Sequence, residues 1–553
     1  MAVYSNKTNV NLLTALLVAH GVRYAVVCPG SRNAPLVHDL SACGSIRCFP
    51  VTDERSAGFQ ALGLCQATGG PVVVCVTSGT ALLNLAPAVA EAFYQHLPLV
   101  VVSADRPPQW IGQLDGQTMP QPDALGRFVR KAVSLPEPCD EEQHWYCNRL
   151  VNEALIAARR DGGGPVHINV PITPPLYDFT EEDLPHERKI EFWSCTSHAC
   201  GAAGIPFAHA LLEGLRRAER PLIVLGQMKP KEVAEEVVEA LEAKDYVVLR
   251  EPLAGPVVAG GLDAMLQKVS LSADMLPDFI LYAGGTLVSR RLKAYLRHCH
   301  HAACWRVDAR GEVADTFLNL TGVVQALPQD VLAAIAGPGN VRWADYWRAL
   351  GDEAWEHCRR YQPDYSGMLA VKLFEERLQR DDCWAVTHYA NSMAVRLGCV
   401  YAPHHIFCNR GVNGIEGSLS TAAGFSLVAG SNVYCVVGDL SFFYDRNALW
   451  NRNLRGNLRV LLLNNGGGGI FEKFSGHLGE AFDRRNVMAQ HHTTARGMCE
   501  DNGVAYRRAG DAASLDEGLR WLTSPQTERP MLLEVVTDAG TDWATYQRYF
   551  ESM

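Results

Sequence analysis

Several features that would place a chain in a familiar class are missing from this sequence of 553 residues. No apolar run reaches the roughly 18 residues of a transmembrane helix, so we expect no membrane partner. The formal net charge of −10 is spread along the chain without a basic block, which argues against nucleic acid as a partner. Residues 1–11 are polar and contain no apolar signal core, and we therefore expect a cytoplasmic protein.

Two further signatures are absent. The 17 cysteines include no CxxC pair, and Cys28, Cys75 and Cys435 lie inside apolar runs. This placement is typical of small buried hydrophobic residues in a reducing compartment. The run Gly466–Gly469 is not followed by Gly-Lys-Ser/Thr, which excludes a Walker-type phosphate loop. The sequence therefore favours neither a disulfide framework nor the commonest nucleotide-binding motif.

What the chain does contain is an alternation of short β-branched runs with amphipathic segments. Such alternation predicts an α/β fold of three doubly wound parallel-sheet domains. We expect them at residues 1–180, 200–340 and 360–553, with a proline-rich and acidic linker at 172–205. The first and third share an order of elements, and the Rossmann-like middle one lacks GxGxxG, so we assign it no dinucleotide. The segments that carry the predicted strands are YAVVCPG, CFPVTDE, VVVCVTSGT, LVVVSADRP and VHINVP, then PLIVLGQ, YVVLREP, FILYAGG and CWRVDA, then CWAVTHY, HIFCNRG, VYCVVGD, RVLLLNN and MLLEVV.

Residues 436–471 predict a site for a metal-bound diphosphate. One apolar run ends at Gly438-Asp439, an amphipathic segment follows, and a second apolar run ends at Asn464-Asn465. Parallel strands joined by a helix end at the same edge of a sheet, so Asp439 and Asn465 should lie side by side. Their oxygens suit Mg²⁺, and the glycines of 466–469 allow close approach of the backbone to a phosphate. The alternative is that Asp439 only caps a helix.

A glutamate in the first domain is the second candidate for chemistry. Glu54 follows a predicted strand and begins the pattern E-x-x-A-x-x-x-A-x-G with Ala57, Ala61 and Gly63. The small residues share one helical face and allow close packing, while the glutamate stands at the helix entrance. A glutamate there is commonly no more than a favourable contact with the helix dipole.

Arginines near predicted strand ends occur in all three domains. Strand ends line the cleft of open α/β sheets, and guanidinium groups bind carboxylates through two hydrogen bonds. The sequence thus predicts substrates with several carboxylates. The arginines concerned are Arg32, Arg106, Arg290, Arg291, Arg396 and Arg410.

These motifs resemble those of the thiamine diphosphate-dependent enzymes. GD followed at this distance by NN is similar to the diphosphate motif of that family, and Glu54 is similar to the glutamate that activates its cofactor. A closer resemblance, to the 2-succinyl-5-enolpyruvyl-6-hydroxy-3-cyclohexene-1-carboxylate synthases (SEPHCHC synthases), covers all three domains. It is carried by PGSR, TDER, TSGTA, ADRPP, NSMAVR, NRGVNGIEG, GDLSFFYD and NNGGGGIF.

The resemblance implies a carboligating transferase of menaquinone biosynthesis with a pyruvate-oxidase-like architecture. Its cofactors would be thiamine diphosphate and Mg²⁺, with Mn²⁺ as a substitute. It would decarboxylate 2-oxoglutarate and add the succinyl carbanion equivalent to isochorismate by 1,4-addition. Both substrates are small dicarboxylates, in keeping with the arginines. In enzymes of this architecture the site lies between two chains, which implies a homodimer or a homotetramer.

The resemblance also implies roles for individual residues. Asp439, Asn465 and the carbonyl of Gly467 would hold the metal, Gly438 would contact the cofactor, and Ile415 would support its bent shape. Glu54, Arg32, Gln117 and Ser392 would be catalytic. The substrate contacts would be Ser31, Arg32, Arg106, Gln117, Arg290, Arg291, Asn391, Ser392, Arg396 and Arg410, with an apolar wall of Ile470, Phe471 and Phe474.

Two departures from the family pattern and two alternative functions stay open. The family often has Lys-Arg where this chain has Arg290-Arg291, and three asparagines before Gly-Gly-Gln where this chain has NNGGGGIF. The second departure leaves the metal register open by one residue. Acetolactate synthase or a simple 2-oxoacid decarboxylase would need fewer arginines. A non-catalytic relative would have no chemical need for Glu54, Asp439 and Asn465 together.

Overall fold

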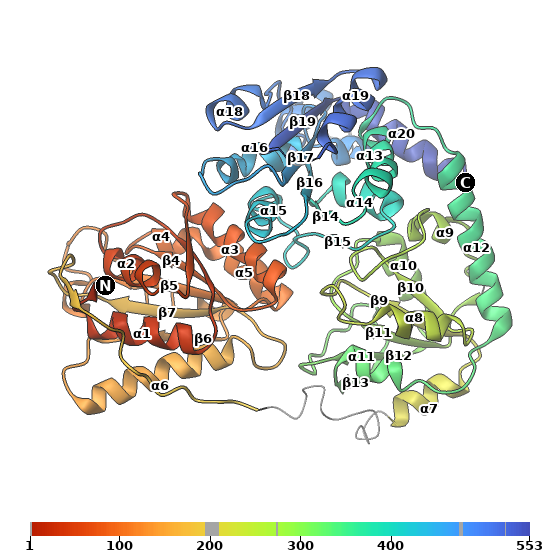
Figure 1. Ribbon diagram of the computed structural model, residues 1–553. Helices are drawn as coiled ribbons and strands as arrows, with labels where there is room; N and C mark the ends of the chain where they lie inside the picture. Colours follow the sequence, from red (N-terminus) through yellow and green to blue (C-terminus); the bar gives the residue numbers. More distant parts are fainter. Residues whose placement is uncertain (1–2, 194–208, 273–274, 475–478, 526) are drawn as a thin grey trace.

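The computed structural model describes residues 3–193, 209–272, 275–525 without 475–478, and 527–553; at residues 473 and 474 it describes the backbone alone. The chain forms three α/β parts, each built on a parallel sheet with helices around it (Figure 1). Two of the sheets have six strands and the middle one has five. The predicted fold class of three parallel-sheet domains is therefore confirmed.

The first sheet has the strand order β3-β2-β4-β5-β7-β6, and every pairing in it is parallel. Its central strands are apolar and fully buried, as strands covered on both faces must be. Helices α1, α2 and α6 cover one face, and α3 and α5 cover the other. The elements are β1 (Tyr4–Ser5), α1 (Thr8–Ala19), β2 (Tyr24–Val27), α2 (Ala34–Ala42), β3 (Arg47–Pro50), α3 (Glu54–Thr68), β4 (Val72–Val76), α4 (Ala81–Asn84), α5 (Ala86–Gln95), β5 (Leu99–Asp105), β6 (Lys131–Ser134), α6 (Glu141–Ala157), β7 (Val166–Pro171) and β8 (Phe179–Glu181).

The middle sheet has the order β10-β9-β11-β12-β13 and is also parallel. Helices α10 and α12 pack on one face, and α7, α8 and α11 pack on the other. The elements are α7 (His209–Arg217), β9 (Pro221–Leu225), α8 (Glu235–Glu242), β10 (Val247–Arg250), α9 (Leu262–Lys268), β11 (Phe279–Ala283), α10 (Arg290–His298), β12 (Ala303–Asp308), β13 (Leu320–Gln325), α11 (Pro328–Ala333) and α12 (Val341–Arg360).

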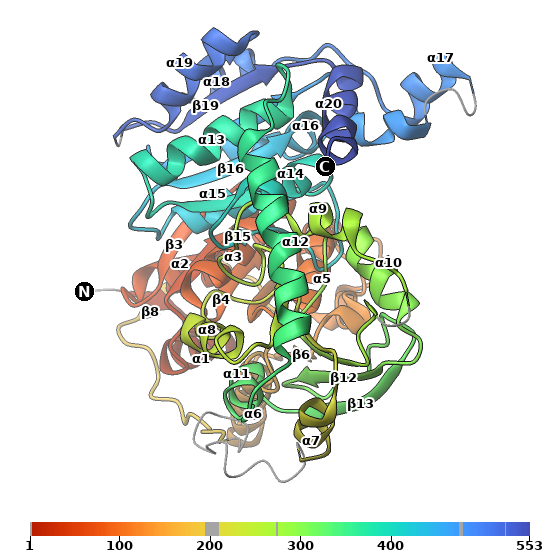
Figure 2. The same cartoon turned by 90° about the vertical axis from the view of Figure 1, so that its right-hand side faces the viewer.

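Helix α12 joins the middle part of the molecule to the last one (Figure 2). The sequence near 337–367 shows few strand signals, and the structure places this 20-residue helix there. Trp343 and Trp347 pack on the middle sheet, while Ala354 and Cys358 belong to the core of the third domain. The helix is therefore shared between two cores.

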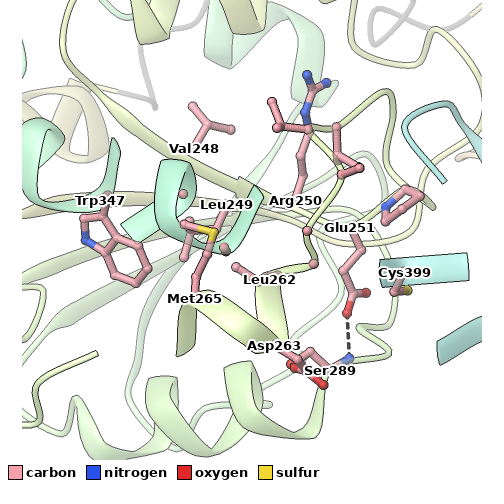
Figure 3. Close-up of a pocket in the computed structure, with 18 of the residues that line it drawn as sticks. Val248, Leu249, Arg250, Glu251, Leu262, Asp263, Met265, Ser289, Trp347 and Cys399 are labelled. Carbon is pink, nitrogen blue, oxygen red and sulfur yellow. Dashed lines mark hydrogen bonds between the residues drawn. The ribbon is translucent and has the colours of Figure 1, made fainter. Parts of the chain in front are cut away.

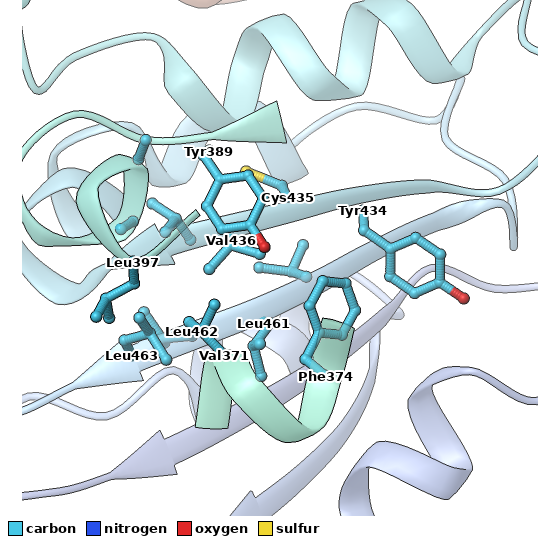
Figure 4. Close-up of a cluster of buried hydrophobic side chains, with 14 of the residues drawn as sticks. Val371, Phe374, Tyr389, Leu397, Tyr434, Cys435, Val436, Leu461, Leu462 and Leu463 are labelled. Carbon is cyan, nitrogen blue, oxygen red and sulfur yellow. The ribbon is translucent and has the colours of Figure 1, made fainter. Parts of the chain in front are cut away.

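The third sheet has the order β15-β14-β16-β17-β19-β18, which repeats the order of the first sheet strand for strand. The apolar core under it contains Val371, Phe374, Tyr389 and Leu397 (Figure 4). The elements are α13 (Gly367–Asp381), β14 (Val386–Tyr389), α14 (Met393–Tyr401), β15 (Ile406–Phe407), α15 (Ser418–Ser426), β16 (Val433–Gly438), α16 (Asp439–Tyr444), β17 (Leu458–Asn464), α17 (Glu480–Phe482), α18 (Arg496–Asp501), β18 (Ala505–Ala509), α19 (Ala512–Leu522), β19 (Met531–Val536) and α20 (Ala539–Glu551).

The first and third domains meet where α3 crosses α15 (Figure 1). A Cβ atom on Gly63 would lie 2.0 Å from the carbonyl oxygen of Thr421, and one on Gly424 would lie 2.0 Å from that of Gln60. Only glycine permits so close an approach of two backbones. The small residues of the Glu54 pattern thus serve the close packing that the sequence predicted.

Candidate active site

The ends of β16 and β17 form the centre of the predicted diphosphate site. Gly438 pairs with Leu463 in the parallel ladder, so Asp439 and Asn465 follow neighbouring strands at one edge of the sheet. Asp439 is buried, and its Oδ2 accepts hydrogen bonds from the backbone N–H groups of Gly466 (2.8 Å) and Gly467 (2.9 Å). The two predicted metal ligands therefore share one edge, and the glycine loop curls around the carboxylate.

The donor set at this edge fits a Mg²⁺ ion and a diphosphate. Asn465 Nδ2 donates to Asp542 Oδ2 at 2.9 Å, an anchor for the amide that does not use its carbonyl oxygen. Burial raises the pKa of Asp439 because it destabilises the charged carboxylate. A bound cation would stabilise that charged form. No group of three or more His, Cys, Asp or Glu side chains in the described ranges would hold a metal. A cation here would therefore rely on the single carboxylate of Asp439 together with amide, carbonyl and phosphate oxygens, as Mg²⁺ does.

The glycine loop has no room for side chains. Gly466 has φ 80°, and a Cβ on Gly467 would lie 2.8 Å from the carbonyl oxygen of Met488. Residues 488–491 cover the loop through the bonds Gly468 N–H to Met488 O (2.7 Å) and His491 N–H to Gly466 O (2.9 Å). The backbone of the loop is thus fixed from outside, which leaves its carbonyl groups at defined positions.

A second set of predicted residues surrounds β14 and β15. Asn391 donates to the carbonyl oxygens of Asn409 (2.6 Å) and Gly414 (2.8 Å), and its Oδ1 accepts a hydrogen bond from Arg410 Nη1 (3.0 Å). Ile415, at the end of this loop, is 42% exposed, and its carbonyl oxygen accepts a hydrogen bond from the hydroxyl of Ser441. This loop therefore brings the guanidinium group of Arg410 and the exposed side chain of Ile415 close to α16, the helix that Asp439 begins.

All three domains hold this loop, which we call the 408–415 loop. Glu91 of the first domain accepts hydrogen bonds from the N–H groups of Gly411 and Val412, both at 2.7 Å. In the middle domain, Gln227 donates to Cys408 O (2.9 Å) and Thr286 donates to the carbonyl oxygen of Arg410 (3.0 Å). Burial raises the pKa of Glu91. Sequence reasoning missed Glu91 because its partners lie 320 residues away along the chain.

The remaining predicted residues of the middle and third domains lie at the starts of α10 and α14, within α14, and in the turn after the glycine loop. Ser392 precedes α14 without a capping hydrogen bond from its side chain, Arg396 lies within this helix, and Arg290 and Arg291 begin α10. The guanidinium of Arg291 lies 4.0 Å from Asp263 Oδ2, and over the ring of Phe550 at 4.3 Å. The apolar candidates Ile470 and Phe471 lie in the turn that follows the glycine loop, where Phe471 is 39% exposed. The side chain of Phe474 lies outside the described part of the structure.

The candidates of the first domain form a separate group. Ser31 and Arg32 follow β2, and Arg106 follows β5, all at the carboxyl edge of the first sheet. Arg32 is 6% exposed and donates to the carbonyl oxygen of Ile172 at 2.8 Å. Burial and the neighbouring charge of Arg106 lower the pKa of Arg32. Arg106 also pairs with Asp115 at 3.0 Å.

Two of the candidates have strained backbones. Gln117 has φ 56° and Ser392 has φ 75°, a region that residues with a side chain rarely adopt. A Cβ on Gly79, in the loop after β4, would lie 3.4 Å from the Cα of Gln117, so the backbone of Gln117 lies against this loop. Strain of this kind is kept where the surrounding structure imposes it, and it clusters at functional sites.

Glu54 begins α3, and its neighbours tie it to the third domain of the same chain. Asp53 caps the helix and accepts a hydrogen bond from Asn447 Nδ2 at 2.7 Å, while Arg55 donates to Tyr444 O at 2.7 Å. The carboxylate of Glu54 accepts a hydrogen bond from Asn84 at 3.4 Å. Among the described residues, no hydrogen bond joins it to the diphosphate edge or to the 408–415 loop. The candidate Glu54 and the candidates of the diphosphate edge are therefore not joined by a hydrogen bond within the described part of one chain.

The cavity drawn in Figure 3 borders the candidates of the middle and third domains. It has a volume of about 550 Å³ and lies between the middle domain and α14, with Leu249, Met265 and Trp347 among its lining residues. Of the predicted site residues, Arg396 reaches it. Glu251, at its edge, accepts hydrogen bonds from the N–H groups of Val288 (2.7 Å) and Ser289 (2.6 Å). Glu251 therefore fixes the loop that leads into Arg290, a role that no sequence motif indicated.

Comparisons with known proteins agree with this arrangement. Three thiamine pyrophosphate enzyme profiles match the chain: the N-terminal TPP binding domain at residues 7–126, the middle domain at 207–386 and the C-terminal TPP binding domain at 389–535. The fold and these matches define a thiamine diphosphate-dependent enzyme. The chain is 42% identical to the SEPHCHC synthase of Bacteroides thetaiotaomicron, with the whole of both chains covered. It is 43% identical to that of Phocaeicola vulgatus (100% of this chain, 99% of the relative) and 36% identical to that of Desulfotalea psychrophila (96% and 98%). The chain belongs to the SEPHCHC synthase family.

Among the residues that the structure describes, no helix combines the length and the hydropathy that a membrane span requires.

Proposed function

We propose that this chain decarboxylates 2-oxoglutarate with thiamine diphosphate and adds the succinyl carbanion equivalent to isochorismate in a 1,4-addition, a carboligating step of menaquinone biosynthesis. The observation that carries the proposal is the pairing of a diphosphate edge, at Asp439 and Asn465, with guanidinium groups gathered at the carboxyl edges of the sheets. The full-length likeness to SEPHCHC synthases supports the choice of substrates. When bound, thiamine diphosphate supplies the electron sink that stabilises the carbanion.

Asp439, Asn465 and the carbonyl of Gly467 are the proposed holders of Mg²⁺, or of Mn²⁺ in its place. The proposal rests on the geometry of this edge: a buried carboxylate, an amide anchored through its nitrogen, and a glycine loop fixed by residues 488–491. Gly438 would contact the diphosphate, and Ile415 would support the cofactor from the 408–415 loop.

The arginines are the proposed carboxylate partners. Arg410 is oriented by Asn391, Arg291 by Asp263 and the Phe550 ring, and Arg32 by the carbonyl oxygen of Ile172. Oriented guanidinium groups bind carboxylates more strongly than mobile ones because less freedom is lost on binding. Two substrates with two carboxylates each make use of such a set. The other proposed contacts are Ser31, Arg106, Gln117, Arg290, Ser392, Arg396, Ile470, Phe471 and Phe474.

Glu54 is the proposed residue that holds a proton at the pyrimidine ring of the cofactor. Within the described part of one chain no hydrogen bond joins Glu54 to the diphosphate edge, and we propose a homodimer, or a tetramer of two such dimers, in which Glu54 faces Asp439 of a second copy. The free thiols of the described cysteines support a reducing compartment, and we propose the cytoplasm.

Carbon dioxide release tests the proposed reaction. The enzyme with thiamine diphosphate and Mg²⁺ is given 2-oxoglutarate with and without isochorismate, and pyruvate serves as the control donor. We expect sustained release that requires 2-oxoglutarate and isochorismate together. Turnover with pyruvate alone would assign the chain to the decarboxylase or acetolactate group, and no turnover with any donor would contradict an enzymatic role.

A further inference from the structure

His491 lies beside the diphosphate edge, and neither the motifs nor the proposed reaction uses it. Its Nε2 is 3.4 Å from Asp439 Oδ2. This nitrogen is buried and has no hydrogen-bond partner among the residues that the structure describes. A buried polar atom without a partner costs free energy unless a bound group satisfies it. The residue therefore calls for a functional explanation.

The chain fixes which nitrogen of this ring carries the proton. The backbone N–H of Thr493 donates to His491 Nδ1 at 3.1 Å, so Nδ1 is the acceptor and, in the neutral ring, Nε2 carries the hydrogen. Thr493 is itself held, because its carbonyl oxygen accepts a hydrogen bond from Asn464 Nδ2 at 2.9 Å. Asn464 in turn donates to the buried Glu534 at 2.7 Å. A continuous set of hydrogen bonds thus aims an N–H group at Asp439.

The ring is also held by packing. His491 N–H donates to the carbonyl oxygen of Gly466, and the ring meets that of Phe443 edge to face, with centroids 5.3 Å apart at 87°. The glycine loop that wraps around Asp439 therefore positions the backbone of His491, and Phe443 of α16 positions its ring. A side chain held in this way loses little freedom when it makes one more hydrogen bond.

We propose that His491 is a positioning residue of the metal site, whose Nε2–H joins the Gly466 and Gly467 N–H groups as a donor to the Asp439 carboxylate. Donors on one side of a carboxylate fix its orientation towards a cation on the other side. Groups that orient metal ligands typically change metal affinity by about 10- to 100-fold when they are removed. The inference rests on the proposed metal site at Asp439.

Binding of Mn²⁺ tests the inference without measuring catalysis. Free Mn²⁺ is followed by its electron paramagnetic resonance signal in the presence of excess thiamine diphosphate and full-length protein. His491→Phe keeps a flat ring without the donor, and His491→Gln keeps an N–H near the position of Nε2. The exposed neighbour provides a matched control as His492→Phe.

We expect His491→Phe to raise the Kd for Mn²⁺ about tenfold or more, with an unchanged melting temperature of the protein without metal. His491→Gln should recover most of the affinity, and His492→Phe should bind like the original protein. Affinity of His491→Phe within twofold of the original protein, or equal losses in the Phe and Gln variants, would overturn the inference. Asp439→Asn tests the proposed metal site separately from the role of His491. If this variant binds Mn²⁺ normally, the proposed metal site itself is wrong.

Discussion

Two inactive variants should restore each other when they share one dimer. Glu54→Gln removes the group proposed to hold a proton, and we expect a loss of about 100-fold or more in kcat. Asp439→Asn removes the proposed metal ligand. A heterodimer of these two chains contains one site with both substitutions and one site with neither, if each site takes Glu54 from one chain and Asp439 from the other. The lack of a described hydrogen bond between Glu54 and the diphosphate edge within one chain motivates this expectation.

The magnitude follows from the symmetry of the dimer. A heterodimer purified through two different tags should show about half of the activity of the original dimer, and an unfractionated random mixture about a quarter. The reciprocal control places both substitutions in one chain and pairs it with an unchanged chain. That heterodimer should be inactive, because each of its sites receives one altered residue. Activity in the reciprocal control and none in the first heterodimer would show that each site lies within one chain and would refute the reasoning.

Three further predictions concern single positions. Gly63→Val should lower the free energy of unfolding by about 3 kcal/mol in urea titrations, because the valine side chain would collide with the carbonyl oxygen of Thr421. The control Gly497→Ala should leave the free energy of unfolding unchanged, because the space around Gly497 is open. Burial raises the pKa of Glu251 from 4.5 to about 6, so its contribution to stability is complete below pH 4.5 and is lost as the pH rises through about 6. Relative to Glu251→Gln, the original protein should therefore lose about 2 kcal/mol across that window, and parallel stability curves would contradict this. Ser392→Gly should raise the melting temperature, because glycine adopts φ 75° without strain. It should also lower kcat if the hydroxyl contacts substrate. A lower melting temperature would exclude strain at this position.

The central sheets were predictable because strands buried on both faces read as continuous apolar runs. Strands β4 and β16 consist almost wholly of valine, cysteine and tyrosine, and their ends could be located from Gly438-Asp439 and similar turns. The juxtaposition of Asp439 with the loop after Asn465 follows from the same reasoning, since parallel neighbours end at one edge. These parts of the fold and the site are encoded locally.

Edge strands and the residues that hold loops were not predictable in this way. Strands β6 and β18 contain lysine, serine and arginine and are only partly buried, so they give no apolar run. The amphipathic segment after Asp439 predicted a helix without bounds, and the structure places α16 there, from Asp439 to Tyr444. His491 and Glu91 act through partners that are distant in sequence or that lie in the backbone of a loop. Such contacts leave no pattern along the chain.

The 408–415 loop has a consequence for how the enzyme responds to motion between its domains. Each of the three domains holds it through a different hydrogen bond, so a shift of any one domain against the others pulls on the backbone that carries Arg410. The position of Arg410 therefore depends on how the three domains are aligned. Conditions that weaken the contacts between domains should displace Arg410, a proposed substrate contact. They should therefore reduce substrate binding before any single sheet unfolds.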